Sequence, residues 1–458
     1  MMRNASFTKL LKRTLHNRPP PSSDLDRLRE IVLGVGSLDD LESDLNRSGI
    51  QVTPSMITQT LESCEADAQS RRLLRFFTWS AKSASPRPAD EPFNLAIRAF
   101  AAKKDPIALN VLISDFRREG RAMDPETFAR AAEALVRCGR EGEAVALFKN
   151  LEAWVRCPRD RVTLAAIVRA LCMKGHARIA EGVVWNHKDR IFIEFCVYES
   201  ILYGWCVSGN VKEASKVLEQ MRSLGVGPKL SSYNSFLSCV CERNVKSNPS
   251  ALAPDASDIM RKMRSFGVAP SVVSFNILLS CLGRVRRVKE ACRVLLSMQG
   301  MGCDPDWYSY YLVVRVLFLT GRFGRGNKLV EEVVAEGLVL EPRFFHYLIG
   351  VLIGKERVGC ALDMLERMKK CCTREYYGPA YDLLIPKLCR GGDFEKGRQL
   401  WDEAVAMGVV LQCSSDVLDP SKTEVFKRTR KHEEEPVPEE PVEESMEGPR
   451  RIKKDLIV

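Results

Sequence analysis

The sequence has no long hydrophobic run, which argues against a membrane-spanning protein. A membrane helix needs roughly 18 consecutive apolar residues. The most apolar segment, Tyr310 to Thr320, is interrupted by Arg315. Among the 458 residues, 28% are charged and 45% are hydrophobic, an ordinary balance for a globular chain. We therefore expect no transmembrane segment and no membrane partner.

Motifs for metal binding and catalysis are also missing. Sixteen cysteines form no C-x-x-C pair, and the Cys239-x-Cys241 and Cys371-Cys372 pairs have no partner pair at zinc-finger distance. The five histidines form no H-E-x-x-H motif. A phosphate-binding G-x-x-x-x-G-K-[S/T] loop, a G-x-S-x-G elbow and a deaminase H-x-E with P-C-x-x-C are absent. We expect no metal, cofactor, small-molecule substrate or enzymatic activity.

Acidic residues are absent from the first 23 positions, which carry five Lys or Arg together with Ser and Thr. This composition is typical of a transit peptide, with a disordered basic start as the alternative. Arginines outnumber serines before Pro19, which favours the mitochondrion over the chloroplast. We expect residues 1–23 to be a disordered transit peptide.

Beyond residue 23, the net charge differs between the C-terminal segment and the middle of the chain. Residues 413–458 carry 9 basic and 12 acidic side chains in blocks that are usually disordered, so we expect a charged tail there. The tail either keeps the protein soluble or contacts RNA or a ribosome. Residues 24–412 then hold +8 of the total +10, a surplus that attracts polyanions such as nucleic acid.

An internal repeat is the strongest feature that the sequence does contain. An aromatic or apolar position is followed by a residue that we call the slot. The slots stand at Asn94, Ala129, Ala165, Glu199, Asn234, Asn276, Tyr311, His346 and Asp382, at intervals of 35, 36, 34, 35, 42, 35, 35 and 36. This register defines about nine repeats over 90–412. Residues 24–89 are expected to be helical, and whether 54–89 form a degenerate tenth helix pair is left open.

One repeat, 195–229, shows why the period predicts helix pairs. Tyr198, Ile201, Leu202 and Trp205 have the spacing of one helical stripe. Gly209 can adopt the left-handed conformation that ends a helix. A second stripe runs from Val211 to Met221, and Gly225 with Pro228 ends it. Two short helices cannot bury both stripes alone, so stacking into an all-α solenoid is expected.

The repeat explains the position of several cysteines, whereas one insertion departs from the period. Cys172, Cys206, Cys241 and Cys389 fall late in the first helices, where a small polarizable side chain suits a tight helix contact. Unpaired thiols also fit a reducing compartment. Repeat 230–271 is seven residues too long, with turn-forming residues around 243–254. We expect a surface loop there, either used for binding or neutral.

The period, with its Gly-x-x-Glu-Ala-like and Gly-x-x-Pro-Asp motifs, resembles the plant-type P-class pentatricopeptide repeat (PPR) family. Its fullest copy is Phe275-Asn276, Val288-Lys289-Glu290-Ala291 and Gly302-Cys303-Asp304-Pro305-Asp306. The tetratricopeptide pattern W-x-x-L-G-x-x-Y is absent. The resemblance covers roughly 90–412 and implies a right-handed superhelical solenoid of helix-turn-helix repeats of about 35 residues. It also implies single-stranded RNA as a partner, with one base per repeat.

In that family the slot and the last residue of the repeat, here the end residue, select the base. The resemblance pairs Asn94 with Asp124 for uridine, Asn234 with Ser271 for cytidine and Asn276 with Asp306 for uridine. For these three repeats a polar helix-start residue without a ligand is the alternative. The implied RNA pattern is U-x-x-x-C-U. Other repeats depart from the family: Ala129 and Ala165 cannot hydrogen-bond a base, and for Glu199, Tyr311 and Asp382 a structural role is favoured.

The resemblance thus implies an organellar protein that binds single-stranded RNA, an organellar transcript or ribosomal RNA, and acts in RNA processing, stability or translation. Two alternatives stay open at this point. The protein could be a structural component of the mitochondrial ribosome, alongside ribosomal or other RNA-processing proteins. It could also be a protein-protein scaffold whose slots have lost their role.

Overall fold

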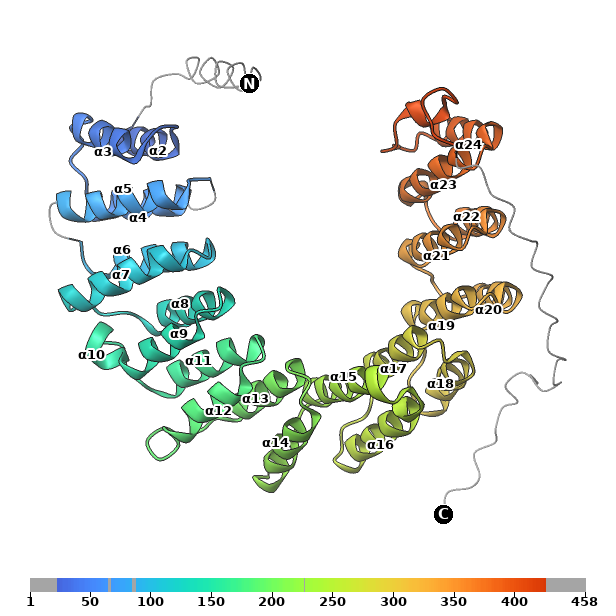
Figure 1. Cartoon of the computed structure of the whole chain (residues 1–458), viewed down its shortest axis with the longest axis horizontal. Coiled ribbons are helices and arrows are strands. Elements are labelled where there is room, and N and C mark those ends of the chain that lie inside the picture. Colours follow the sequence, from blue (N-terminus) through green and yellow to red (C-terminus); the bar gives the residue numbers. More distant parts are fainter. Residues whose placement is uncertain (1–22, 65–66, 85–87, 226, 426–458) are drawn as a thin grey trace. The chain divides into compact units, whose positions relative to one another are not determined.

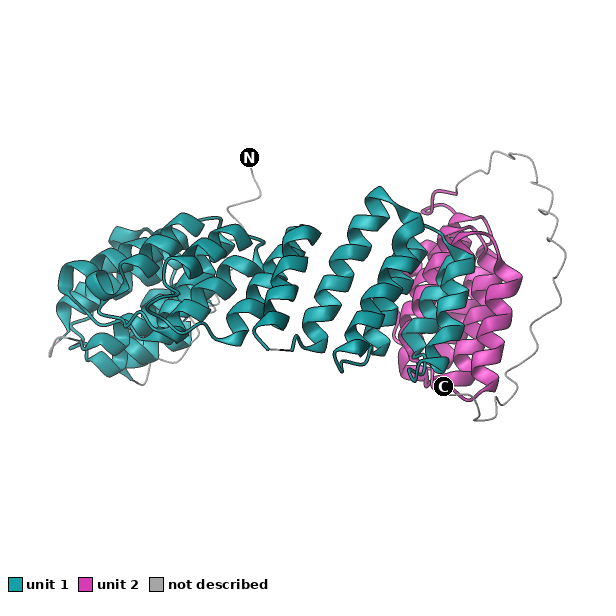
Figure 2. Ribbon diagram, turned by 90° about the horizontal axis from the view of Figure 1, so that it is seen from below, with its two compact units in different colours: residues 1–316 teal, residues 317–458 magenta. Residues whose placement is uncertain are grey.

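A computed structural model describes residues 23–64, 67–84, 88–225 and 227–425. The expected transit peptide therefore lies outside the described residues except for Ser23, and so does the tail from residue 426 onward. Two compact units divide the chain, residues 1–316 and residues 317–458 (Figure 2). The described residues form helices and connecting turns with no strand among them, which confirms the expected all-α class.

The helices of the first unit are mostly 13 or 14 residues long from α5 onward. They are α2 (Asp24–Leu33), α3 (Leu38–Arg47), α4 (Pro54–Cys64), α5 (Ser70–Ser83), α6 (Asp90–Ala102), α7 (Pro106–Glu119), α8 (Pro125–Arg137), α9 (Glu141–Lys149), α10 (Leu151–Val155), α11 (Arg161–Met173), α12 (Ala177–Trp185), α13 (Phe195–Val207), α14 (Val211–Ser223), α15 (Leu230–Ser247), η1 (Pro249–Ala251), α16 (Leu252–Ser265), α17 (Val272–Arg284) and α18 (Val288–Gly300).

The boundary between the units falls within α19. The helices from this point are α19 (Trp307–Leu319), α20 (Phe323–Ala335), α21 (Pro342–Gly354), α22 (Val358–Cys371), η2 (Arg374–Tyr376), α23 (Gly378–Arg390), α24 (Phe394–Ala406) and η3 (Ser415–Leu418).

The first helices of successive repeats form a continuous layer in the first unit. Helix α6 packs on α8, α8 on α11, α11 on α13, α13 on α15 and α15 on α17 (Figure 1). Each second helix packs chiefly on the first helices around it. First helices are therefore apolar on more than one side, whereas second helices carry a single buried stripe. The slots, which stand near the start of the first helices, are brought into one row by this layer.

Repeat 195–229 follows the expected pattern closely. Ile201, Leu202 and Trp205 are buried in α13, while Tyr198 is only half-buried and Val197 takes the buried position at the helix start. Gly209 has φ of 74°, the left-handed conformation that ends the helix without a Cβ clash. Each fully buried apolar side chain of this kind contributes about 1.5–3 kcal/mol to folding.

The late-helix cysteines lie in tight contacts, as expected. Cys172, Cys241 and Cys389 are buried, and Cys206 is half-buried. A Cβ placed on Gly204 of α13 would lie 2.8 Å from the Cβ of Cys172 on α11. The close approach of these two helices therefore requires a glycine opposite the cysteine. None of the sixteen cysteines, all of which lie in the described ranges, forms a disulfide.

The prediction of a surface loop around 243–254 is wrong. Residues 243–247 continue α15 to Ser247, and after the short η1 helix α16 begins at Leu252. Buried Asn244 donates from Nδ2 to Asp255 Oδ2 at 2.8 Å, which ties the extension of α15 to α16. Helix α15 ends at Ser247. The next residue, Asn248, leaves the helical conformation because it directly precedes Pro249.

The beginning of the expected tail packs on the second unit. Gln412 N and Cys413 N both donate to Asp382 Oδ1 at 2.9 Å, and η3 contacts α23 and α24. Disorder from residue 413 is therefore contradicted as far as 425, because Asp382 holds the start of the segment.

The described part of the chain shows neither a membrane-spanning helix nor a metal-binding cluster. None of its helices combines the length and hydropathy needed to cross a bilayer. None of its His, Cys, Asp and Glu side chains gather in a group of three or more that could hold a metal ion.

Candidate nucleic-acid interface

The slot side chain hydrogen-bonds the residue 30 positions later in five repeats. Glu199 Oε2 accepts from Lys229 Nζ at 3.3 Å, His346 Nε2 donates to the Tyr376 carbonyl at 2.8 Å, and Asp382 Oδ1 accepts from Gln412 N. Asn94 and Asn276 make the corresponding bonds, described below. Residue i+30 is the end residue of each of these repeats, so the fold brings together the two positions that the family resemblance singled out.

Asn94 is 4% exposed, and its whole amide is engaged in bonds within the protein. Its Nδ2 donates to the carbonyls of Asp90 and Ala122, and its Oδ1 accepts from Asp124 N at 3.1 Å. Arg98 donates to Asp124 Oδ2 at 3.3 Å. Asn94 thus contacts the backbone of Asp124, while the carboxylate of Asp124 is paired with an arginine.

Asn276 is 8% exposed and binds the carboxylate of its end residue directly. Its Nδ2 donates to Asp306 Oδ1 at 3.2 Å, and its Oδ1 accepts from Ser309 Oγ at 2.7 Å. The same Asp306 Oδ1 accepts from Ser309 N and so caps α19. Within the described ranges no bond to Asp306 Oδ2 is found, which leaves this oxygen available to a ligand.

Asn234 is linked to its end residue through a serine. Its Oδ1 accepts from Ser274 Oγ at 2.7 Å, and Ser274 Oγ in turn accepts from Ser271 N at 3.1 Å. The seven extra residues of this repeat move Ser271 to position i+37, so the i+30 register is not kept here. The three residues nevertheless form one polar chain across the junction between repeats.

A hydroxyl two residues before the slot is a functional position that our sequence reasoning missed. In three repeats it donates to the slot of the preceding repeat: Ser232 to Glu199, Ser274 to Asn234 and Ser309 to Asn276. Five buried Ser or Thr occupy this position, namely Thr127, Thr163, Ser232, Ser274 and Ser309. Their spacing is visible in the sequence and could have revealed them, because a buried hydroxyl needs a partner.

The remaining slots offer less to a base. The Tyr311 ring stacks on Tyr308, with ring centroids 5.7 Å apart. Burial lowers the pKa of His346, so this side chain is neutral near pH 7 and supplies no positive charge to a phosphate. Burial, together with the nearby Asp382 carboxylate, raises the pKa of Cys413 to about 12, which keeps this thiol protonated.

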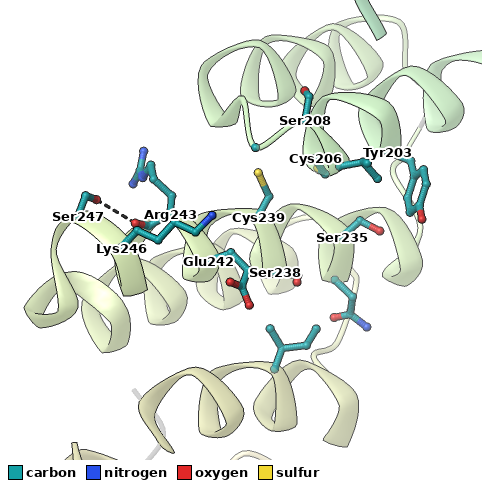
Figure 3. Close-up of a pocket in the computed structure, with 14 residues that line it drawn as sticks. Tyr203, Cys206, Ser208, Ser235, Ser238, Cys239, Glu242, Arg243, Lys246 and Ser247 are labelled. Atoms are coloured by element: carbon teal, nitrogen blue, oxygen red, sulfur yellow. Dashed lines mark hydrogen bonds between the residues drawn. The ribbon is translucent and has the colours of Figure 1, made fainter. Parts of the chain in front are cut away.

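An open groove of about 800 Å³ lies along α15, between α13 and α17 (Figure 3). Asn234 lines it, and so do Tyr203 from α13 and Arg243 and Lys246 from the extension of α15. Tyr203 is 46% exposed. Sequence reasoning found Asn234 but missed the other three residues. Arg243 and Lys246 were missed because the segment after Glu242 was expected to leave the helix, and Tyr203 because it lies outside the slot and end positions.

These features define the class of protein: a helical-repeat array whose repeats of about 35 residues carry a polar pair at the slot and the end residue. Two family models match parts of the chain, the pentatricopeptide repeat domain over residues 187–243 and the PPR repeat family over 270–318. A mitochondrial pentatricopeptide repeat-containing protein of Arabidopsis thaliana is 51% identical over 408 residues, which cover 89% of this chain and 83% of that protein. The chain belongs to the pentatricopeptide repeat family.

Two further similarities differ in what they cover. The small ribosomal subunit protein mL104 (rPPR9) of Arabidopsis thaliana is 29% identical over 380 residues, or 82% of this chain and 72% of that protein. The crystal structure of the pentatricopeptide repeat protein PPR10 with an 18-nt psaJ RNA element aligns at a TM-score of 0.46 with 18% identity. That alignment covers 90% of this chain and 65% of the other, just under two thirds of its length. The expected mitochondrial localisation is confirmed by the name of the 51% identical relative.

Proposed function

We propose that this protein binds single-stranded RNA in mitochondria along the first helices of its repeats, and acts there in RNA processing, stability or translation. The polar pair of slot and end residue carries the proposal. Its members are hydrogen-bonded to each other in five repeats, so these repeats carry polar groups at the same place. Membership of the pentatricopeptide repeat family and the positive charge of residues 24–412 support it.

The six proposed base-reading residues are not equivalent. Asn276 with Asp306 is the strongest pair, because the amide touches the carboxylate and Asp306 Oδ2 is available. Asn234 with Ser271 comes next, since Asn234 also lines the open groove. Asn94 with Asp124 is the weakest, because Arg98 already pairs with the carboxylate. The slot side chains are hydrogen-bonded to the next repeat, and a buried polar group left without a bond is costly. A base that binds a slot must therefore replace the hydrogen bonds that it breaks.

The proposed mechanism is steric rather than catalytic. An array lying on RNA shields it from exonucleases, holds a hairpin open or presents a neighbouring site to another factor. The proposed organisation is a transit peptide at 1–23, a helical region at 24–89, the array at 90–412 and a tail from 413. The tail begins with an ordered segment to 425.

A salt titration of the purified full chain with a single-stranded RNA containing UAAACU tests the proposal. We expect binding at low salt whose affinity falls as salt is added, with a slope of about −0.7 for each phosphate contacted. An RNA in which the two uridines and the cytidine of UAAACU are replaced by adenosine serves as the control and should bind less tightly. Failure to bind any single-stranded RNA at low salt would falsify the proposal and favour a protein-protein scaffold.

A second candidate is a structural role in the mitochondrial ribosome. The observation that favours it is the 29% identity to mL104, a small ribosomal subunit protein, over most of both chains. Sedimentation of a tagged protein from mitochondrial lysate distinguishes the two functions. Stoichiometric migration with a ribosomal subunit supports the structural role, whereas migration with one or a few transcripts supports the first proposal.

A further inference from the structure

Helix α15 has 18 residues, whereas its neighbours α13 and α17 have 13 each. The extra length comes from the excess residues of repeat 230–271. It continues a stripe already present on α15, because Ser235, Ser238, Glu242 and Lys246 follow one another at three- and four-residue spacing. All four side chains line the groove, so the extension lengthens the wall of the groove and adds basic residues to it (Figure 3).

The acidic and basic side chains in this part of the groove differ in how strongly they are paired. Glu242, the acid on the stripe, is paired with Arg284 of α17. Arg243 has a side chain 47% exposed and lies 3.5 Å from Asp255, whose Oδ2 accepts a shorter bond of 2.8 Å from Asn244. Lys246 is exposed one turn further along. An anion that enters the groove therefore meets Arg243 and Lys246, while the Glu242 carboxylate is compensated by Arg284.

These cations lie further along the same groove than the slot. Arg243 is nine residues after Asn234 and Lys246 is twelve, which correspond to roughly 13 and 18 Å along a helix that rises about 1.5 Å per residue. Because all three side chains line the groove, an RNA strand with a base at Asn234 can continue along α15 toward the two long, flexible cations. The ring of Tyr203 lies over the end of α15 that carries Ser235, where a base would lie (Figure 3).

We propose that the extension of α15 is a phosphodiester-binding subsite, in which Arg243 and Lys246 hold the RNA backbone beside the base at Asn234. This inference rests on the proposed RNA-binding function. It makes repeat 230–271 an anchoring point of the array, because backbone contacts position the RNA for any sequence whereas base contacts discriminate between sequences.

The test uses the full chain with R243Q/K246Q, which removes two positive charges and keeps good helix formers. The matched control is R261Q/K262Q, two exposed cations on α16 of the same repeat. Binding of the single-stranded RNA is measured between 0.1 and 1 M salt. For the groove variant we expect the salt slope to weaken by about 1.4, and the affinity at 0.1 M salt to fall roughly 10- to 30-fold, with unchanged preference between bases. The control should keep the wild-type slope.

Three outcomes would overturn the inference, and they are distinguishable. If the wild type binds RNA and both variants change its slope equally, the groove cations act only through net charge. If R243Q/K246Q leaves RNA binding intact but loses a co-purifying acidic protein, the groove binds a peptide. If the wild type binds no single-stranded RNA, the proposed function fails together with the subsite. R243K, which keeps the charge, should retain the wild-type slope, and melting curves show whether each variant is folded.

Discussion

Repeats 90–124 and 272–306 have the same two residue types, Asn in the slot and Asp as the end residue. The structure places these two residues in different surroundings in each repeat. Asn94 reaches past the carboxylate to the backbone of Asp124, and Arg98 occupies the carboxylate. In the second repeat Ser280 stands where the first has Arg98, four residues after the slot, and Asn276 contacts Asp306 directly. The same two residue types therefore form one pair whose carboxylate is bound to an arginine and one whose carboxylate is bound by the slot amide.

The comparison teaches that slot and end residue alone do not determine what a repeat can bind. A carboxylate whose second oxygen is paired with a guanidinium offers fewer acceptor sites to a base than one without that guanidinium. Arg98 also donates to Glu91 at 2.9 Å, so it is held from two sides. We therefore expect the residue four positions after the slot to be a third determinant in these two repeats.

The largest effect that we expect is on RNA affinity. Replacing Asn276 by Ala removes a base contact and should weaken binding of RNA containing UAAACU by about 1–3 kcal/mol, roughly 5- to 150-fold. Replacing Asn94 by Ala should weaken RNA binding less than threefold, because Arg98 already pairs with the carboxylate of its end residue, Asp124. Fluorescence anisotropy with both variants measures the difference, and equal losses would remove the distinction between the two repeats.

For the free energy of unfolding, we expect the larger loss from the Asn94 variant and the smaller loss from the Asn276 variant. Asn94→Ala leaves Asp124 N and two backbone carbonyls short of a partner in a site that is 4% exposed, which should cost about 1–3 kcal/mol. Asn276→Ala should cost about 1 kcal/mol or less, since Ser309 still donates to Asp306 and satisfies it. Urea unfolding of the two variants measures the difference. A larger loss for Asn276→Ala would contradict our account of the hydrogen bonds.

The smallest expected effect comes from exchanging the third determinant. Arg98→Ser removes the guanidinium from the Asp124 carboxylate, which then keeps only its bonds from Thr127, and Ser280→Arg is designed to place a guanidinium beside Asp306. The first should increase discrimination at the first uridine, and the second should reduce it at the last uridine. Each change is about two- to fivefold, the size of a partly exposed ion pair. Affinities for RNAs altered at one position check this, and no change in either variant would leave Arg98 a purely structural residue.

Much of the fold followed from the sequence because it depends on local rules. The 35-residue period places the slots near the start of the first helices, and Gly209 ends α13 in the left-handed conformation as expected. The extension of α15 was missed because its cause is a tertiary bond, from buried Asn244 to Asp255, that overrides the turn-forming residues after it. The start of the tail was missed for a similar reason, since Asp382 binds two of its amides.

The candidate site was less predictable than the fold. The residue types at the slot and end positions are visible in the sequence, but the hydrogen-bond partner of each side chain is not. Arg98 and Asp124 are 26 residues apart, and only the packing of α6 on α8 brings them together. The hydroxyls at Ser274 and Ser309 had a readable period, yet their role depends on burial against the preceding slot. Long-range hydrogen bonds of this kind leave no signal in a single repeat.

One measurement tests the central claim most directly: the affinity of the wild-type chain for RNA containing UAAACU, compared with two RNAs in which either the first or the last uridine is replaced by guanosine. We predict tight binding of the first RNA, a loss of about 1–3 kcal/mol when the last uridine is replaced, and a much smaller loss at the first position. Equal affinity for all three RNAs, or no binding of any, would contradict the account.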